Sequence, residues 1–149
     1  MRKIETILVA EDDTADAFFL ERAFAKIGVA TNLQFVRDGQ EAIEYLLGKG
    51  QFSDRTVHPD PDLLLLDLKM PRLDGFQVLD WVRQQPQLKR LPAIIFSSSA
   101  QEKDVNRAYD LGANSYLVKP HSSEDLLALV EKLKNYWFEA HKKPNPLLE

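Results

Sequence analysis

Residues able to handle a phosphoryl group and a divalent cation stand at the ends of short apolar runs in this sequence. Glu11 and Asp12 follow the first run, Asp67 follows the third, and Ser97 and Lys119 follow the fourth and fifth. A carboxylate can attack phosphorus, and carboxylate oxygens favour Mg²⁺ or Mn²⁺ over Zn²⁺. Each residue alone is at least as typical of a turn, a helix cap or a surface charge. Their shared position after apolar runs favours one common site.

The elements that would position these residues alternate along the chain. Apolar runs too short for helices predict five strands, and residues spaced three to four apart predict five helices between and after them. A polar segment, 49–61, is expected to be an exposed loop. The alternation predicts an α/β fold with a doubly wound parallel sheet, in which ligands bind beyond the carboxyl ends of the strands. The expected strands are 7–10, 33–36, 63–66, 93–96 and 116–118.

Composition narrows the class of protein. With 44% hydrophobic and 28% charged residues in 149, the chain fits a single ordinary globular domain. The formal net charge of −4 argues against nonspecific nucleic-acid binding, which needs a basic face. The chain contains no cysteine, so disulfides and thiolate metal sites are excluded. Neither a signal-peptide pattern nor a membrane-length apolar run is found, so we expect a cytoplasmic protein without membrane contact.

Several motifs in order resemble the receiver domain of bacterial response regulators. Each motif is weak alone, but their order and spacing together are specific. The resemblance covers about residues 1–137 and implies a flavodoxin-like fold of five strands in the order 2-1-3-4-5. Residues 138–149 would then form a C-terminal extension. The motifs are Ile7–Asp12, Asp67–Gly75 with Met70-Pro71 and Asp74-Gly75 inside it, Ser97, Gly112-Ala113 and Tyr116–Pro120.

The resemblance assigns the phosphoryl acceptor and its cofactor. It implies that Asp67 is phosphorylated and that the cofactor is Mg²⁺. Asp12 and Asp67 would bind the metal directly, and Glu11 would act through water. The backbone carbonyl of Lys69 would supply a further ligand.

The resemblance also assigns the residues that bind and sense the phosphoryl group. Ser97 and Lys119 would bind its oxygens. Ser97 and Tyr116 would reorient on phosphorylation and change the surface formed by the fourth and fifth helices with the fifth strand. The peptide bond before Pro120 is expected to be cis.

The implied function is signalling rather than enzymatic turnover of an independent substrate. A sensor histidine kinase would supply the phosphoryl group, and a histidine phosphotransfer protein could receive it. The long connection 48–61 and the chain beyond residue 137 resemble single-domain regulators of bacterial phytochrome-type kinases. Two alternatives remain open. A phosphatase of the haloacid-dehalogenase kind would need an aspartate where Lys69 stands, and a receiver-like scaffold without phosphorylation would not need the complete polar set.

Three consecutive aromatic residues predict a homodimer through the last helix. Trp137 continues the apolar stripe of Val130 and Leu133, but Tyr136 and Phe138 beside it cannot face the same core. At least one aromatic side chain should therefore point outward as an anchor for a second copy. The alternative is that these side chains fold back under the segment 144–148 of their own chain.

Overall fold

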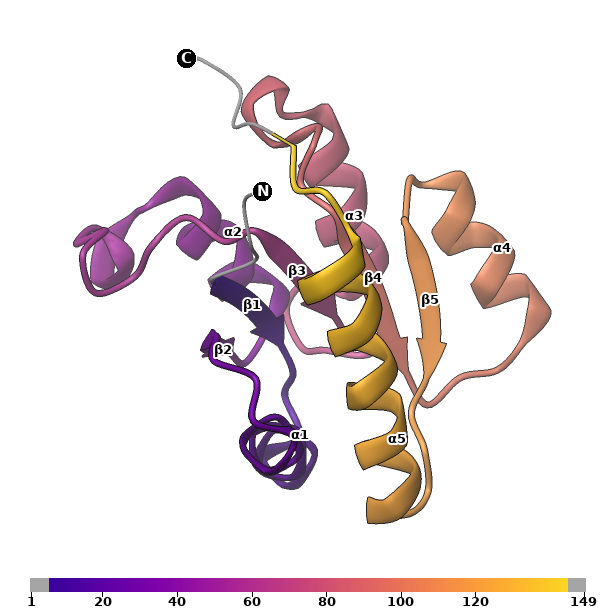
Figure 1. Cartoon of the computed structure of the whole chain (residues 1–149). Coiled ribbons are helices and arrows are strands. Elements are labelled where there is room, and N and C mark those ends of the chain that lie inside the picture. Colours follow the sequence, from indigo (N-terminus) through magenta and orange to yellow (C-terminus); the bar gives the residue numbers. More distant parts are fainter. Residues whose placement is uncertain (1–5, 145–149) are drawn as a thin grey trace.

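The computed structural model describes residues 6–144 and contains one five-stranded sheet (Figure 1). All strand pairs are parallel, and their order is β2-β1-β3-β4-β5, which confirms the predicted doubly wound fold. The strands are β1 (Thr6–Ala10), β2 (Asn32–Val36), β3 (Leu63–Leu66), β4 (Ala93–Ser97) and β5 (Ser115–Val118). The helices are α1 (Thr14–Ile27), α2 (Gly39–Leu47), α3 (Gly75–Gln84), α4 (Glu102–Asp110) and α5 (Ser123–Leu133).

Helices cover both faces of the sheet, which explains why its central strands are apolar throughout. Alternate side chains of a strand point to opposite faces, so Leu8 packs with α2, α3 and α4 while Val9 packs with α1 and α5. All four residues of β3 are buried because this strand lies at the centre of the sheet. The strand order reverses between β1 and β3, so the carboxyl ends of these two strands form the expected ligand-binding edge.

Four of the five α-helices begin at a polar side chain that caps the first turn. The caps are Asp13 for α1, Asp38 for α2, Asp74 for α3 and Ser122 for α5. Each accepts backbone N–H groups that would otherwise lack a partner. Helices α1, α2 and α3 thus start near the carboxyl ends of β1, β2 and β3. None of the helices between residues 6 and 144 is long and apolar enough to cross a membrane.

The segment 49–61 is more ordered than a purely exposed loop, so that prediction is wrong in part. A short 3₁₀ helix, Gly50–Phe52, places the Phe52 side chain in the core, where its ring packs against Tyr45. The guanidinium of Arg55 donates to the carbonyls of Leu46 and His58. A single buried aromatic residue in a polar segment gives no periodicity from which this packing could be read.

The chain beyond α5 continues as a wider helix, which changes where the three aromatic residues point. Residues Lys134–Ala140 form π-helical turns, in which more residues fit in each turn than in an α-helix. Both Trp137 and Phe138 therefore pack against the core beneath α1 and α5, and Phe138 meets the ring of Phe24 edge-on. Tyr136 points outward with 54% of its surface exposed, as expected for at least one of the three.

The segment after the π-helical turns returns to its own domain. The ring of His141 packs against Trp137 with the two rings tilted by 51°, and Lys143 forms an ion pair with Asp62 just before β3. Trp137 thus packs against His141 of its own chain, while Tyr136 remains exposed. Residues 145–148 of the proposed covering segment lie outside the described part of the chain.

Gly75 allows the start of α3 to touch the backbone that carries Asp67. A Cβ atom at Gly75 would lie 2.2 Å from the Asp67 carbonyl oxygen and 2.8 Å from the Leu68 Cα. We expect Gly75→Ala to lower the free energy of unfolding by about 3 kcal/mol, because rigid backbone must move. At Gly28 nothing lies within 4 Å but φ is +79°, so Gly28→Ala should cost only about 1 kcal/mol. Urea unfolding of both variants tests this; equal losses would contradict the steric explanation.

Candidate functional site

Three carboxylates meet at the edge of the sheet where β1 and β3 end. Glu11, Asp12 and Asp67 each offer one oxygen, and these oxygens lie within 4.8 Å of one another. Glu11 and Asp67 are buried, whereas Asp12 is exposed. Burying like charges this close is unfavourable unless a cation or protons neutralise them. Three hard oxygen donors without histidine or cysteine suit a divalent ion such as Mg²⁺ or Mn²⁺.

Backbone hydrogen bonds fix Asp67 at this edge. Its N–H donates to the carbonyl of Ala10 at 3.1 Å, which continues the pairing of β3 with β1. Its carboxylate Oδ1 accepts the N–H of Leu68 at 2.7 Å. The N–H of Gly75 in turn donates to the Leu68 carbonyl at 2.9 Å. Asp67 is therefore anchored at its backbone and at one carboxylate oxygen, which leaves its other oxygen for further partners.

The ammonium of Lys119 is the cation within this cluster. Its Nζ lies 2.7 Å from Glu11 Oε1 and 2.9 Å from Asp67 Oδ2, and its side chain is only 12% exposed. The N–H of Lys119 donates to the Ser97 carbonyl at 2.8 Å, so the pairing of β5 with β4 sets its position. Burial alone would lower the pKa of Lys119, but hydrogen bonds to Glu11, Asp16 and Asp67 outweigh it and raise the pKa above its ordinary value.

Sequence reasoning missed the third partner of Lys119. Asp16, in the first turn of α1, accepts a hydrogen bond from Nζ at 2.9 Å. Its sequence signal was weak, because an acidic residue in the first turn of a helix is ordinarily explained by the helix dipole.

Burial raises the pKa of Glu11 to about 7, and the negative charge of Asp67 adds to the shift. The hydrogen bond from Lys119 opposes it without cancelling it. Near neutral pH and without a metal ion, the Glu11 carboxyl group is therefore protonated in part of the molecules. A bound divalent cation would displace that proton, because metal ligands must be deprotonated.

The end of β4 and the loop after it form the other wall of the site. Ser97 is buried at the end of β4, and its hydroxyl oxygen accepts the N–H of Ser99 at 3.2 Å. The Ser99 hydroxyl donates to Asp104 on α4, at 2.5 Å. Tyr116 donates its phenolic hydrogen to the Ser99 carbonyl at 2.7 Å. Ser99 therefore connects both predicted switch residues, Ser97 and Tyr116, to the first turn of α4.

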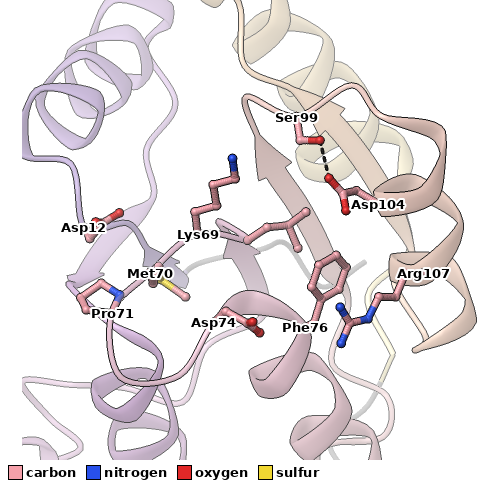
Figure 2. A pocket seen from close by; sticks show the side chains of 10 residues that line it. Asp12, Lys69, Met70, Pro71, Asp74, Phe76, Ser99, Asp104 and Arg107 are labelled. Atoms are coloured by element: carbon pink, nitrogen blue, oxygen red, sulfur yellow. Dashed lines mark hydrogen bonds between the residues drawn. The ribbon is translucent and has the colours of Figure 1, made fainter.

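An open pocket of about 550 Å³ lies between these two walls (Figure 2). Figure 2 shows the side chain of Lys69 between Asp12 on one side and the Ser99–Asp104 pair on the other. The guanidinium of Arg107 lies 4.2 Å from the centre of the Phe76 ring at the base of this pocket and links α4 to α3. Of the predicted metal set, Lys69 and Asp12 line the pocket, and Asp12 also belongs to the carboxylate cluster with the buried Glu11 and Asp67.

The prediction of a cis peptide bond before Pro120 is wrong. None of the peptide bonds among residues 6–144 is cis. The trans form is the intrinsically favoured one, by about 0.5–1 kcal/mol for a bond before proline. With this bond in the trans form, Lys119 still reaches Glu11, Asp16 and Asp67.

The sequence matches the profile of a known protein family. The profile of the response regulator receiver domain matches residues 7–131. The probable methanogenesis regulatory protein FilR2 of Methanothrix harundinacea is 38% identical over 141 residues, which cover 94% of this chain and 88% of that protein. The response regulator Rcp1 of Synechocystis is 34% identical over 140 residues, covering 94% and 93%.

Solved structures of similar proteins share the fold across almost their whole length. RPA3017, described in red light signalling of R. palustris, is 37% identical with a TM-score of 0.90. The phosphorylated cyanobacterial phytochrome response regulator RcpA is 34% identical with a TM-score of 0.87. The Mn²⁺-bound form of Rcp1 is 33% identical with a TM-score of 0.85. Each comparison covers 95% of this chain and 99% of the other.

The raised pKa of Glu11 predicts how stability depends on pH when a chelator removes divalent ions. The folded state holds a proton on Glu11 up to about pH 7, whereas the unfolded chain releases it near 4.5. The free energy of unfolding should therefore fall as pH rises from about 5 to about 8. Lys119 contributes no slope there, because its pKa is raised above an already high value.

Urea unfolding at several pH values measures this slope, with Glu11→Gln as the comparison because glutamine does not titrate. The slope should largely disappear in Glu11→Gln. The assignment is wrong if the variant keeps the wild-type slope, or if wild-type stability rises over this range.

Proposed function

This chain belongs to the response regulator receiver family, and on that premise we propose that it is a phosphorylation-controlled signalling protein whose acceptor is Asp67. The observation that carries the proposal is the environment of Asp67. Its Oδ2 lies 2.9 Å from the Lys119 ammonium, and it shares a cluster with Glu11 and Asp12. Glu11 is also buried, contacts Lys119 and belongs to this cluster. Asp67 is preferred as the acceptor because it begins the segment Asp67–Gly75 that resembles the receiver motif.

The proposed reaction is a transfer between two groups without net redox change. A carboxylate oxygen of Asp67 forms a bond to phosphorus while the bond from phosphorus to the donor, a phosphohistidine nitrogen or acetate oxygen, breaks. The leaving group departs with that electron pair. Lys119 donates a hydrogen bond to a phosphoryl oxygen, and the Ser97 hydroxyl, freed from the Ser99 N–H, donates another. Asp12, Asp67 and the Lys69 carbonyl would hold Mg²⁺, whose charge would neutralise the phosphoryl oxygens.

The same contacts provide the proposed output. Turning Ser97 towards a phosphoryl group ends its hydrogen bond with the Ser99 N–H, and Ser99 also holds Tyr116 and Asp104. The β4–α4 loop would therefore rearrange, and the surface of α4, β5 and α5 would change with it. Tyr116 is already bonded to this loop, so the switch acts by shifting an existing contact rather than by creating one.

We propose a sensor histidine kinase as the phosphodonor and the cytoplasm as the place of transfer. A kinase of the phytochrome type is supported by the names of RcpA and of the red-light regulator RPA3017. A histidine phosphotransfer protein is a second candidate partner, because its phosphohistidine offers the same leaving group.

Phosphorylation is tested with radiolabelled acetyl phosphate and Mg²⁺. Wild type should gain one acid-stable, base-labile label, and Asp67→Asn should gain none, because an amide cannot act as the nucleophile. Asp80→Asn, an exposed position on α3, should be labelled like wild type. Label on Asp67→Asn equal to wild type would refute the acceptor, and omission of Mg²⁺ with excess chelator should suppress labelling in both active proteins.

We further propose that Tyr136 anchors a homodimer. Its ring is exposed, and it is held by edge-on packing with Trp137, so it offers a preorganised apolar surface. Trp137 and Phe138, the other predicted dimer residues, pack on their own core, so they would support the interface from beneath.

Sedimentation equilibrium at micromolar concentration tests this interface. Wild type should be dimeric, and Tyr136→Ala should shift it towards monomer by at least about tenfold in dissociation constant, which is typical of losing a central aromatic anchor. Tyr109→Ala is the matched control, because Tyr109 is similarly exposed but lies on α4. A monomeric wild type, or a dimer that only Tyr109→Ala weakens, would contradict the assignment.

A further inference from the structure

Lys119 has one acidic partner that the proposed acceptor and metal site do not need. This partner is Asp16, in the first turn of α1, whose carboxylate oxygen lies 2.9 Å from the Lys119 Nζ. The Asp16 side chain is 42% exposed, whereas those of Glu11 and Asp67 are almost fully buried. An ammonium has three N–H donors. Glu11, Asp16 and Asp67 supply three acceptors, so all donors of Lys119 are in use.

A phosphoryl group on Asp67 requires one of these donors. While the phosphoryl group approaches, Asp67 is still a carboxylate, so releasing it or Glu11 from Lys119 would leave a buried carboxylate short of a partner, which is costly. Releasing Asp16 costs less, because water can solvate an exposed carboxylate. Asp16 is therefore the partner that a phosphoryl oxygen would displace.

We propose that Asp16 is a positioning residue that restrains Lys119 and competes with the phosphoryl group for its third N–H. This inference rests on the proposed phosphorylation of Asp67. This competition lowers the rate of phosphoryl transfer to Asp67 and the affinity of the site for a phosphoryl analogue.

The negative charge of Asp16 should also disfavour phosphorylation of Asp67. A phosphoryl group carries about −1.5 to −2 charge at neutral pH. Asp16 and Asp67 both touch the Lys119 ammonium, so the new charge would form close to the Asp16 carboxylate. Their repulsion is weakened by solvent, because Asp16 is partly exposed. Removing Asp16 should therefore favour phosphorylation for two reasons. It frees an N–H donor of Lys119, and it removes a nearby negative charge.

If Asp16 only stabilised α1, replacing it would not speed phosphorylation. An acidic residue in the first turn stabilises a helix through its dipole. If that were its whole contribution, Asp16→Ala would lower stability and leave phosphorylation unchanged or slower. The direction of the change in rate therefore separates the two roles.

The test compares full-length wild type, Asp16→Ala, Asp16→Glu and Glu21→Ala. Glu21 is an exposed acid on the same helix, so Glu21→Ala removes one charge and inserts the same residue away from Lys119. The readouts are the initial rate of labelling by acetyl phosphate and the half-saturating beryllofluoride concentration, both at saturating Mg²⁺. Asp16→Ala should label roughly fivefold faster and bind the analogue roughly fivefold more tightly, about 1 kcal/mol in each case. Glu21→Ala should match wild type, and Asp16→Glu should restore most of the restraint.

A second readout needs no metal ion. Unfolding of Asp16→Ala, Lys119→Met and the double variant with chelator present gives the coupling between the two side chains. The coupling should be favourable and clearly different from zero. A wild type that takes no label would overturn the proposed function and this inference with it. Label on wild type, with an equal or lower rate in Asp16→Ala or with zero coupling, would overturn the inference alone.

Discussion

The structure of the site depends on placing one ammonium group among carboxylates that would otherwise repel one another. Glu11 and Asp67 are buried, and Lys119 is the cation that contacts both. Burying two such groups unpaired would cost several kcal/mol. The order of the strands provides the pairing, because β1 and β3 are neighbours and β5 is joined to β3 through β4. The polar edge therefore exists only when the whole sheet is assembled.

Close backbone contacts hold the Asp67 side of this edge in place. A Cβ atom at Gly75 would meet the Asp67 carbonyl at 2.2 Å, and one at Gly39 would meet the Leu73 carbonyl at the same distance. The starts of α3 and α2 are thus pressed against the loop that follows β3. Arg72 in this loop has φ of 67° and pairs with Asp38, the cap of α2. The opposite wall is held by side-chain hydrogen bonds of Ser99, which can exchange more easily than backbone packing.

Much of the fold, and the meeting of Glu11, Asp12, Asp67 and Lys119, could be predicted from sequence because both follow from the pattern of apolar runs and the polar residues after them. Unbroken apolar runs such as Leu63–Leu66 indicate buried strands, and polar residues after such runs must meet at one edge of a parallel sheet. What escaped prediction depends on contacts between distant segments. Asp16 resembles an ordinary first-turn acid until Lys119 is placed beside it, and Phe52 gives no periodic signal in its polar segment. The π-helical turns at Lys134–Ala140 direct the Phe138 side chain towards the core, and a projection that assumes an α-helix cannot show this.

The contacts around Asp67 connect it to both faces of the sheet. Lys119 contacts Asp16 on α1, which packs on one face with α5. Ser97 contacts Ser99, whose side chain reaches α4 on the other face. A phosphoryl group that recruits both Lys119 and Ser97 would weaken one contact on each side at the same time. The central strands are too tightly packed to transmit a gradual deformation. Two separate polar contacts at the edge can instead carry a change of charge to helices on opposite faces without disturbing the core between them.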